Sequence, residues 1–466
     1  MTEEEVSLLL NTFMYLDYKE ASDGMKLKEI LEDLSTLPDY QEGGIHYGEY
    51  CILKEASIDS RIGDLVIGNQ SHLLGYDSGT NACTFAEEGG STYVVYRGTA
   101  DGEWFDNGLG MTSESTLQQE RALAYFEEVV EREQISPGDR LIVSGHSKGG
   151  NKAQFVTMNT KYDGLLDACY SIDGQGFSEE AMLSFYRKWG VFAYRKRAEK
   201  IIGICGENDY VSSLLNCVIL PENRYYIKTP VDRENFVGYH DIKYLFETEE
   251  ITDANGKVST IFHGKKNPYT AGKGELGNWA MALSDEIMKL PPKKRKGCAA
   301  FLMQLMELKG KRKDGLNGER LRLSDAETFL ELGIPVIIKT LLASEEGWRF
   351  FDEVKSGGSF ASEMQGSVCF KAYGRGLYRQ SDRVLDFQRK GAELIKKLEF
   401  LSDEMDVYMK GNPLLKHRLM TEKRRLEERL DALKEIADLL KVSGDLYGKK
   451  DREAKDAFLQ VGSFQG

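Results

Sequence analysis

One stretch of the chain has the residue types and spacing of a serine nucleophile. Residues 141–155 read LIVSGHSKGGNKAQF, in which Gly145-His146-Ser147-Lys148-Gly149 fits the pattern G-x-S-x-G. In that pattern a serine lies on a sharp turn between a buried strand and a helix, and the glycines remove Cβ atoms that would clash there. An ordinary glycine-rich connection is the alternative interpretation, so the assignment of Ser147 depends on its partners.

A serine hydroxyl is a weak nucleophile and needs a neighbouring base. Three histidines follow Ser147, namely His240, His263 and His417. His240 comes shortly after a strand-like segment at 225–228, where a hydrolase with the chain order Ser, Asp, His has its histidine loop. We therefore predict that His240 is the base, with His263 as the alternative.

Two aspartates could orient that histidine. Asp173 follows the first strand-like run after Ser147, and Asp209 follows the second. The later position is the better one for reaching a histidine loop, whereas Asp173 stands beside Gly174 and suits a turn. We predict Asp209 as the acid, which would orient the base and stabilise its charged form, and keep Asp173 as the alternative.

An acyl-transfer site also needs hydrogen-bond donors for the oxyanion that forms on the substrate. The backbone N–H of Lys148, directly after the nucleophile, is the first expected donor. Thr99 is expected to supply the second through its N–H, helped by its hydroxyl, because Arg97-Gly98-Thr99 follows a strong strand pattern at 92–96. The alternative is an ordinary turn at the end of that strand.

These residues can meet only if the segments around them form a parallel sheet. Short apolar runs alternate with helix-like segments from residue 92 onward, a pattern typical of buried parallel strands. The predicted fold class is therefore α/β, with strands at 92–96, 141–144, 169–172, 201–205 and 225–228 and helices around 116–132, 150–160 and 179–198. Asn255-Gly256 further predicts a hairpin turn within 251–262.

Charge and periodicity change near Pro291-Pro292. The whole chain has a formal net charge of −14, but residues 291–466 carry a net +6 and residues 1–290 a net −20. Long amphipathic helices on either side of Gly411-Asn412-Pro413 predict an antiparallel hairpin at about 384–442. We therefore predict an α/β domain at 1–290, which holds the whole candidate site, and a helical region at 291–466.

Composition argues against several classes of protein. The acidic first part is a poor nucleic-acid binder, and we interpret the basic run 293–296 as a solvated linker. The seven cysteines form no C-x-x-C pair, which argues against a zinc site and for a reducing compartment. The acidic N-terminus is unlike a signal peptide, and no apolar run approaches the ~18 residues of a membrane span. We expect a cytoplasmic protein that needs no metal and no organic cofactor.

Several motifs together resemble known lipases. Tyr96-Arg97-Gly98-Thr99 with Trp104 and Asn107 resembles a segment of class 3 lipases, as do the elbow and the stretch GENDYVSSL at 206–214. The stretches SGHSKGGNKA, YSIDGQGF and LLNTFMYLDY look still more like an uncharacterised bacterial lipase-like family related to class 3 lipases, in which Lys148 is usual. The resemblance covers roughly residues 5–285. It implies an α/β-hydrolase fold with Ser147, Asp209 and His240 as the triad.

The residues and the resemblance predict a serine hydrolase that cleaves carboxylic esters. An acyl lipid is the expected substrate, with a transient contact to a membrane surface, and the segment 104–117 would either shield an apolar pocket or pack on the core. Two competing hypotheses are a non-catalytic scaffold and a bacterial effector. In these, the helical hairpin binds a protein partner or a second copy of the chain, or serves non-classical export.

Overall fold

The computed structural model describes residues 1–309 except 19–20, 72–80, 101, 232–235 and 253–257, and beyond 309 only isolated residues. The chain forms two compact units, Met1–Leu321 and Arg322–Gly466. The sheet and the helices that surround it belong to the first unit. The helical hairpin predicted at 384–442 lies outside the described residues and stays a prediction.

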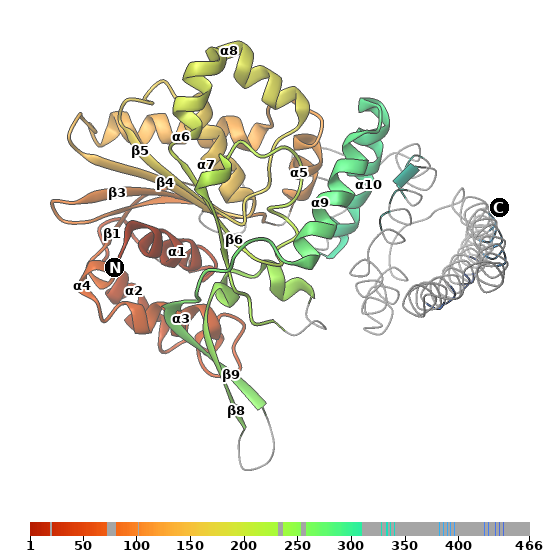
Figure 1. The fold of residues 1–466 in the computed structure, drawn as a ribbon. Coiled ribbons are helices and arrows are strands. Elements are labelled where there is room, and N and C mark those ends of the chain that lie inside the picture. Colours follow the sequence, from red (N-terminus) through yellow and green to blue (C-terminus); the bar gives the residue numbers. More distant parts are fainter. Residues whose placement is uncertain are drawn as a thin grey trace, which may run out of the picture. The chain divides into compact units, whose positions relative to one another are not determined.

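A seven-stranded sheet with the order β1-β2-β3-β4-β5-β6-β7 is the centre of the first unit (Figure 1). Strands β1 (Val66–Ser71), β2 (Ala82–Ala86) and β3 (Ser91–Tyr96) pair antiparallel. From β3 onward the neighbours pair in parallel, through β4 (Arg140–His146), β5 (Leu166–Ile172), β6 (Ile201–Gly206) and β7 (Arg224–Ile227). The prediction of an α/β fold with a mostly parallel sheet is confirmed, while the antiparallel pairing of β1, β2 and β3 was not predicted.

Helices cover both faces of this sheet. One face carries α1 (Glu3–Phe13), α2 (Leu27–Leu34) and α3 (Tyr47–Ala56), and the other carries α6 (Leu117–Arg132), α7 (Lys148–Asn159) and α8 (Glu179–Ala198) (Figure 1). Successive strand residues point to opposite faces, so Ile142 packs with the first group and Val143 with the second. Strand β4 is therefore buried on both sides, which explains its unbroken apolar run.

The N-terminal helix is fastened to the strand that precedes Ser147. Thr2 and Glu5 form a capping box at the start of α1, which satisfies backbone N–H groups of its first turn. Farther along α1, the buried Asn11 donates from Nδ2 to Ser144 Oγ on β4 at 3.0 Å. The end of α1 is thereby held beside the end of β4, close to the elbow.

Besides α10 (Pro292–Lys309), the described part of the unit contains several short helices, the longer helix α9 and a hairpin. The helices are η1 (Pro38–Tyr40), α4 (Ser60–Gly63), α5 (Trp104–Gly110), η2 (Pro221–Asn223), η3 (Phe236–His240), η4 (Ile242–Leu245) and α9 (Glu275–Met288). Strands β8 (Phe246–Thr252) and β9 (Val258–Lys266) pair antiparallel as predicted, while their Asn255-Gly256 turn lies outside the described residues. Among the described residues, none of the helices combines the length and apolarity needed to span a membrane.

The first compact unit continues past Pro291-Pro292. Helix α10 (Pro292–Lys309) begins at the second proline and packs against α5. The basic run 293–296 therefore lies in the first turns of a helix and is not the solvated linker that its composition suggested. Arg295 is 1% exposed, pairs with Glu180 at 2.7 Å and donates to the backbone oxygen of Met288 at 3.1 Å. Its partner comes from a distant helix, which a run of basic letters cannot reveal.

This packing predicts where the chain can be cut. A fragment of residues 1–321 should unfold cooperatively, whereas a fragment of residues 1–290 should have a melting temperature lower by several degrees or should aggregate. The reason is that removal of α10 uncovers the apolar surface it buries on the first unit and leaves Glu180 without Arg295. Circular dichroism melts and size-exclusion chromatography of both fragments would check this. Equal melting temperatures would place the boundary at the proline pair instead.

Candidate active site

Ser147 lies on a sharp turn between β4 and α7. Its φ is 58° and its ψ is −125°, a conformation that non-glycine residues rarely adopt. A Cβ on Gly145 would lie 2.1 Å from the backbone carbon of Gly149, and a Cβ on Gly149 would lie 2.1 Å from the backbone oxygen of Tyr96. Both glycines of G-x-S-x-G are therefore required by close backbone contact. This geometry is that of a nucleophile elbow.

The structure brings Ser147, His240 and Asp209 into one hydrogen-bonded row. His240, the last residue of η3, has its Nε2 2.8 Å from Ser147 Oγ and its Nδ1 2.7 Å from Asp209 Oδ1. Asp209 is fully buried, and its carboxylate also accepts from the backbone N–H groups of Val211 at 3.3 Å and Ser212 at 2.5 Å. These bonds hold the carboxylate, and the carboxylate holds the ring with Nε2 toward the serine.

The residues considered as alternatives to His240 and Asp209 form no hydrogen bond with this row in the described part of the chain. His263 is on β9, where its Nδ1 is 3.1 Å from Glu55 Oε2, and His417 lies outside the described residues. Asp173 lies at the end of β5 with a φ of 45°, and its Oδ1 accepts from the backbone N–H of Gly206 at 2.8 Å. Asp173 thus orders a turn beside the row without contacting His240 through a hydrogen bond.

Burial shifts the pKa of Asp173. The side chain is 1% exposed, which raises its pKa well above the usual value, and the neighbouring Asp209 carboxylate raises it further. The single N–H bond from Gly206 works in the opposite direction but is the smaller effect. Burial and the nearby Asp209 carboxylate therefore both favour the protonated form of Asp173.

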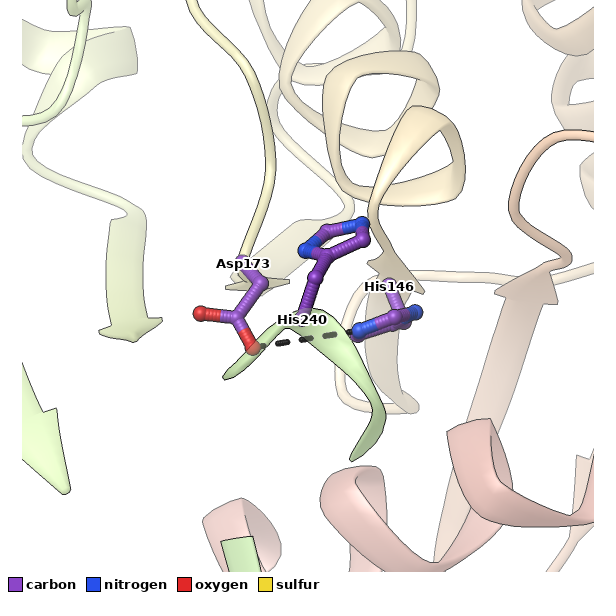
Figure 2. Close-up of side chains that lie close together, drawn as sticks. All are labelled: His146, Asp173 and His240. Atoms are coloured by element: carbon purple, nitrogen blue, oxygen red, sulfur yellow. Dashed lines mark ion pairs between the residues drawn. The ribbon is translucent and has the colours of Figure 1, made fainter. Parts of the chain in front are cut away.

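His146, the residue before Ser147, lies against the ring of His240. Its ring stacks on that of His240, with centroids 4.9 Å apart and planes 27° apart, and Figure 2 shows both rings beside Asp173. His146 Nδ1 is 2.6 Å from the hydroxyl of Tyr15, which follows α1. Burial lowers the pKa of His146 well below its usual value, and the nearby His240 lowers it further. A neutral imidazole therefore lies against the His240 ring.

His146, Asp173 and His240 also raise the question of a metal site, because one ligand atom of each lies within 4.8 Å of the others. A metal ion binds an imidazole nitrogen in the plane of the ring, so two histidine ligands must converge on one point. Here the two rings are stacked, and both nitrogens of His240 already have partners at 2.7 and 2.8 Å. His146 Nε2 and Asp173 Oδ2 are 3.8 Å apart (Figure 2). The arrangement suits proton transfer at His240 better than metal ligation.

The two expected oxyanion donors border Ser147. A Cβ on Gly98 would lie 3.3 Å from the Cβ of Ser147, so the segment that leads to Thr99 runs alongside the nucleophile. Asn107, on α5, donates from Nδ2 to Thr99 Oγ1 at 2.9 Å and holds that hydroxyl in place. Lys148 is the first residue of α7, where a backbone N–H has no partner within the helix.

Tyr15 and His146 are site residues that reasoning from the sequence missed. His146 occupies a variable position of G-x-S-x-G, so the motif gives it no role. The available signal is its residue type, an imidazole that can form hydrogen bonds at the end of a buried strand. Tyr15 lies in LLNTFMYLDY, which was used only for the resemblance. Its role depends on the packing of α1 against β4, a long-range contact with no local signal.

A comparison with models of protein families gives a match. Residues 59–227 match a family model described as Mbeg1-like, which is well under half of the chain. The matched range contains Thr99, Ser147 and Asp209 and ends before His240. A search of curated proteins finds no similar sequence.

The raised pKa of Asp173 predicts a pH-dependent effect of Asp173→Asn on stability. Because the folded-state pKa is raised, wild type has its full stability from this group below the unfolded-state pKa of about 3.9 and loses it as the pH rises. Asparagine cannot ionise, so the melting temperature of the variant minus that of wild type should increase from pH 4 to pH 8. The matched control is Asp285→Asn, an exposed position on α9, where this difference should not change with pH. A constant difference for Asp173→Asn would mean that Asp173 is ionised.

Proposed function

We propose that this protein is a serine hydrolase that cleaves carboxylic esters through an acyl-enzyme, on an α/β-hydrolase fold. One observation carries the proposal: a serine on a turn with positive φ is joined through His240 to a buried aspartate, with contacts of 2.8 and 2.7 Å. Each of the three residues does something that ester hydrolysis needs, namely nucleophilic attack, proton transfer and orientation of the base.

In the proposed reaction, Ser147 Oγ attacks the ester carbonyl carbon while His240 Nε2 takes the hydroxyl proton. The carbonyl oxygen becomes an oxyanion, which accepts hydrogen bonds from the N–H groups of Thr99 and Lys148. The C–O bond to the alcohol then breaks, and His240 returns the proton to the leaving oxygen. Water then attacks the acyl carbon while His240 takes its proton. As the bond between the acyl carbon and Ser147 Oγ breaks, His240 passes that proton to Oγ, which releases the carboxylic acid and restores Ser147 and His240.

The surroundings of His240 suit the proposed proton transfer. The imidazolium that forms during attack would have the Asp209 carboxylate as its partner at 2.7 Å. Burial raises the pKa of Asp173 and lowers the pKa of His146, so burial favours the uncharged form of both neighbours. The Asp209 carboxylate is therefore the group proposed to stabilise the charged ring.

The substrate class has separate support. The resemblance of the motifs to lipases favours an acyl lipid ester, and the Mbeg1-like match covers the segment with Ser147 and Asp209. On the same basis we propose a transient contact with a membrane surface. Residues 291–466, through the hairpin predicted at 384–442, are proposed to bind a protein partner or a second copy of the chain.

Removal of the nucleophile tests the proposal directly. Wild type should react with a fluorophosphonate probe and hydrolyse p-nitrophenyl butyrate. Ser147→Ala should lose labelling and at least ~10³-fold in kcat, because members of a triad act as one unit. Its melting temperature should stay near that of wild type, since both residues carry a Cβ and face the same backbone strain. Equal labelling of wild type and Ser147→Ala would end the nucleophile assignment, and an unlabelled wild type would end the proposed function.

The partners of Ser147 are tested by two matched pairs. His240→Ala should match Ser147→Ala in severity, while His263→Ala should keep nearly full activity because that ring pairs with Glu55 on β9. Asp209→Asn should lower kcat, though less than the histidine change, because the acid orients the ring and stabilises its charge. Asp173→Asn should remain within a few-fold of wild type. A larger loss of kcat for Asp173→Asn than for Asp209→Asn, with folding intact, would exchange the roles of the two aspartates.

A further inference from the structure

Two lysines at the start of α7 are buried against two acids of the α5 segment. The Lys148 and Lys152 side chains are 0% exposed, as is that of Glu103, and that of Asp106 is 2% exposed. Lys148 Nζ lies 2.9 Å from Asp106 Oδ2, and Lys152 Nζ lies 3.7 Å from Glu103 Oε2. Lys148 and Lys152 are one helical turn apart on α7, and Glu103 and Asp106 are about one turn apart at the start of α5. Both ion pairs therefore lie along one contact between the two helices.

Further bonds connect these acids to the segment around Thr99. Glu103 Oε2 accepts from the backbone N–H of Ala100 at 3.2 Å, and Lys152 Nζ donates to the backbone oxygen of Arg97 at 3.4 Å. The segment 97–100 is therefore tied at both ends to the second ion pair. Asn107, next to Asp106 on α5, donates to Thr99 Oγ1 at 2.9 Å. Movement of α5 away from α7 would displace the Thr99 hydroxyl.

We propose that Lys148 and Lys152 are positioning residues, whose buried ammonium groups hold α5, and through Asn107 the hydroxyl of Thr99, beside Ser147. The proposal rests on the serine hydrolase function argued above. Lys148 then acts in two ways: its backbone N–H is one oxyanion donor, and its side chain, through Asp106 and Asn107, sets the position of the Thr99 hydroxyl that helps the second donor. This gives a role to the buried lysine side chain of GHSKG.

Stability alone does not explain the two pairs. Desolvation of buried charges is costly, and apolar residues of similar size are often as stable in their place. Burial raises the pKa of Glu103 and lowers that of Lys152, so the low polarity of the site opposes charge on both. Asp106 is better supported, since it also accepts from Thr116 Oγ1 at 2.8 Å and the backbone N–H of Gln118 at 3.2 Å. The Lys148–Asp106 pair is therefore the firmer link between α7 and α5.

The test removes that link without leaving an unpaired charge. Lys148→Met/Asp106→Asn keeps Oδ1 as the acceptor for the N–H of Gln118, places an amide Nδ2 that can donate to the hydroxyl of Thr116, and removes the ion pair with α7. The matched control is Lys200→Met/Asp163→Asn, a partly buried pair at 3.1 Å near the opposite ends of the strands. For both double variants we measure the melting temperature, the hydrogen–deuterium exchange of residues 99–110, and the kcat and KM for p-nitrophenyl butyrate.

We expect the site variant to fold, with exchange of residues 99–110 at least ~10-fold faster than in wild type. Its kcat should fall by about 10- to 100-fold with KM changed less than about threefold, because a displaced oxyanion donor acts on the transition state. The control variant should leave both the exchange of residues 99–110 and kcat as in wild type. Unchanged exchange in the folded site variant would overturn the proposal, whether or not the protein hydrolyses esters. Absence of hydrolysis by wild type would instead remove the proposed function.

A double-mutant cycle separates positioning from a general structural effect. Asn107→Ala is made in wild type and in Lys148→Met/Asp106→Asn. If the ion pair acts by placing the hydroxyl that Asn107 holds, then Asn107→Ala should lower kcat less in the variant than in wild type. Additive losses would overturn the route through Asn107. If the first variant does not fold, Lys152→Met/Glu103→Gln replaces it with the same expected changes in exchange and kcat.

Discussion

The positive φ of Ser147 is the constraint on which the rest of the site depends. Such a conformation costs of order 1–3 kcal/mol and persists only when its surroundings determine it fully. Here the N–H of Ser147 donates to the backbone oxygen of Ile172 at 2.9 Å, and Gly149 touches the backbone of Tyr96 so closely that no Cβ fits. The ends of β3, β4 and β5 therefore meet at this turn. The parallel sheet itself sets the position of the nucleophile.

Two neighbouring carboxyl groups differ in their hydrogen-bond donors. Asp209 has the N–H groups of Val211 and Ser212 and the His240 ring as partners, whereas Asp173 has one N–H from Gly206. Hydrogen bonds to a carboxylate stabilise its charged form, whereas burial raises the pKa of Asp173. The difference in donors, and not the distance from the sheet, distinguishes the acid of the row from its neighbour.

The sequence was sufficient to predict those parts of the fold and site that short stretches of neighbouring residues encode. The strands were visible as apolar runs, the elbow as G-x-S-x-G, and the order of Ser147, Asp209 and His240 selected three residues that the structure places in one row. The contacts of Tyr15, the buried state of Arg295 and the contact of Lys148 with Asp106 were not predictable in this way. Each depends on a partner from a distant segment, and no periodicity encodes such a pairing.

The site also links parts of the chain that seem separable by composition. Asn107, which holds the Thr99 hydroxyl, is on α5, and α5 is packed between the two buried lysines of α7 and the helix α10. Helix α10 in turn is fixed to the start of α8 by the pair of Arg295 and Glu180. Since α8 follows β5 and α7 follows β4, the same strands that place Ser147 also anchor the helices around α5. Residues 292–309 thus belong to the same compact unit as the candidate site, although the charge balance of the chain changes before them.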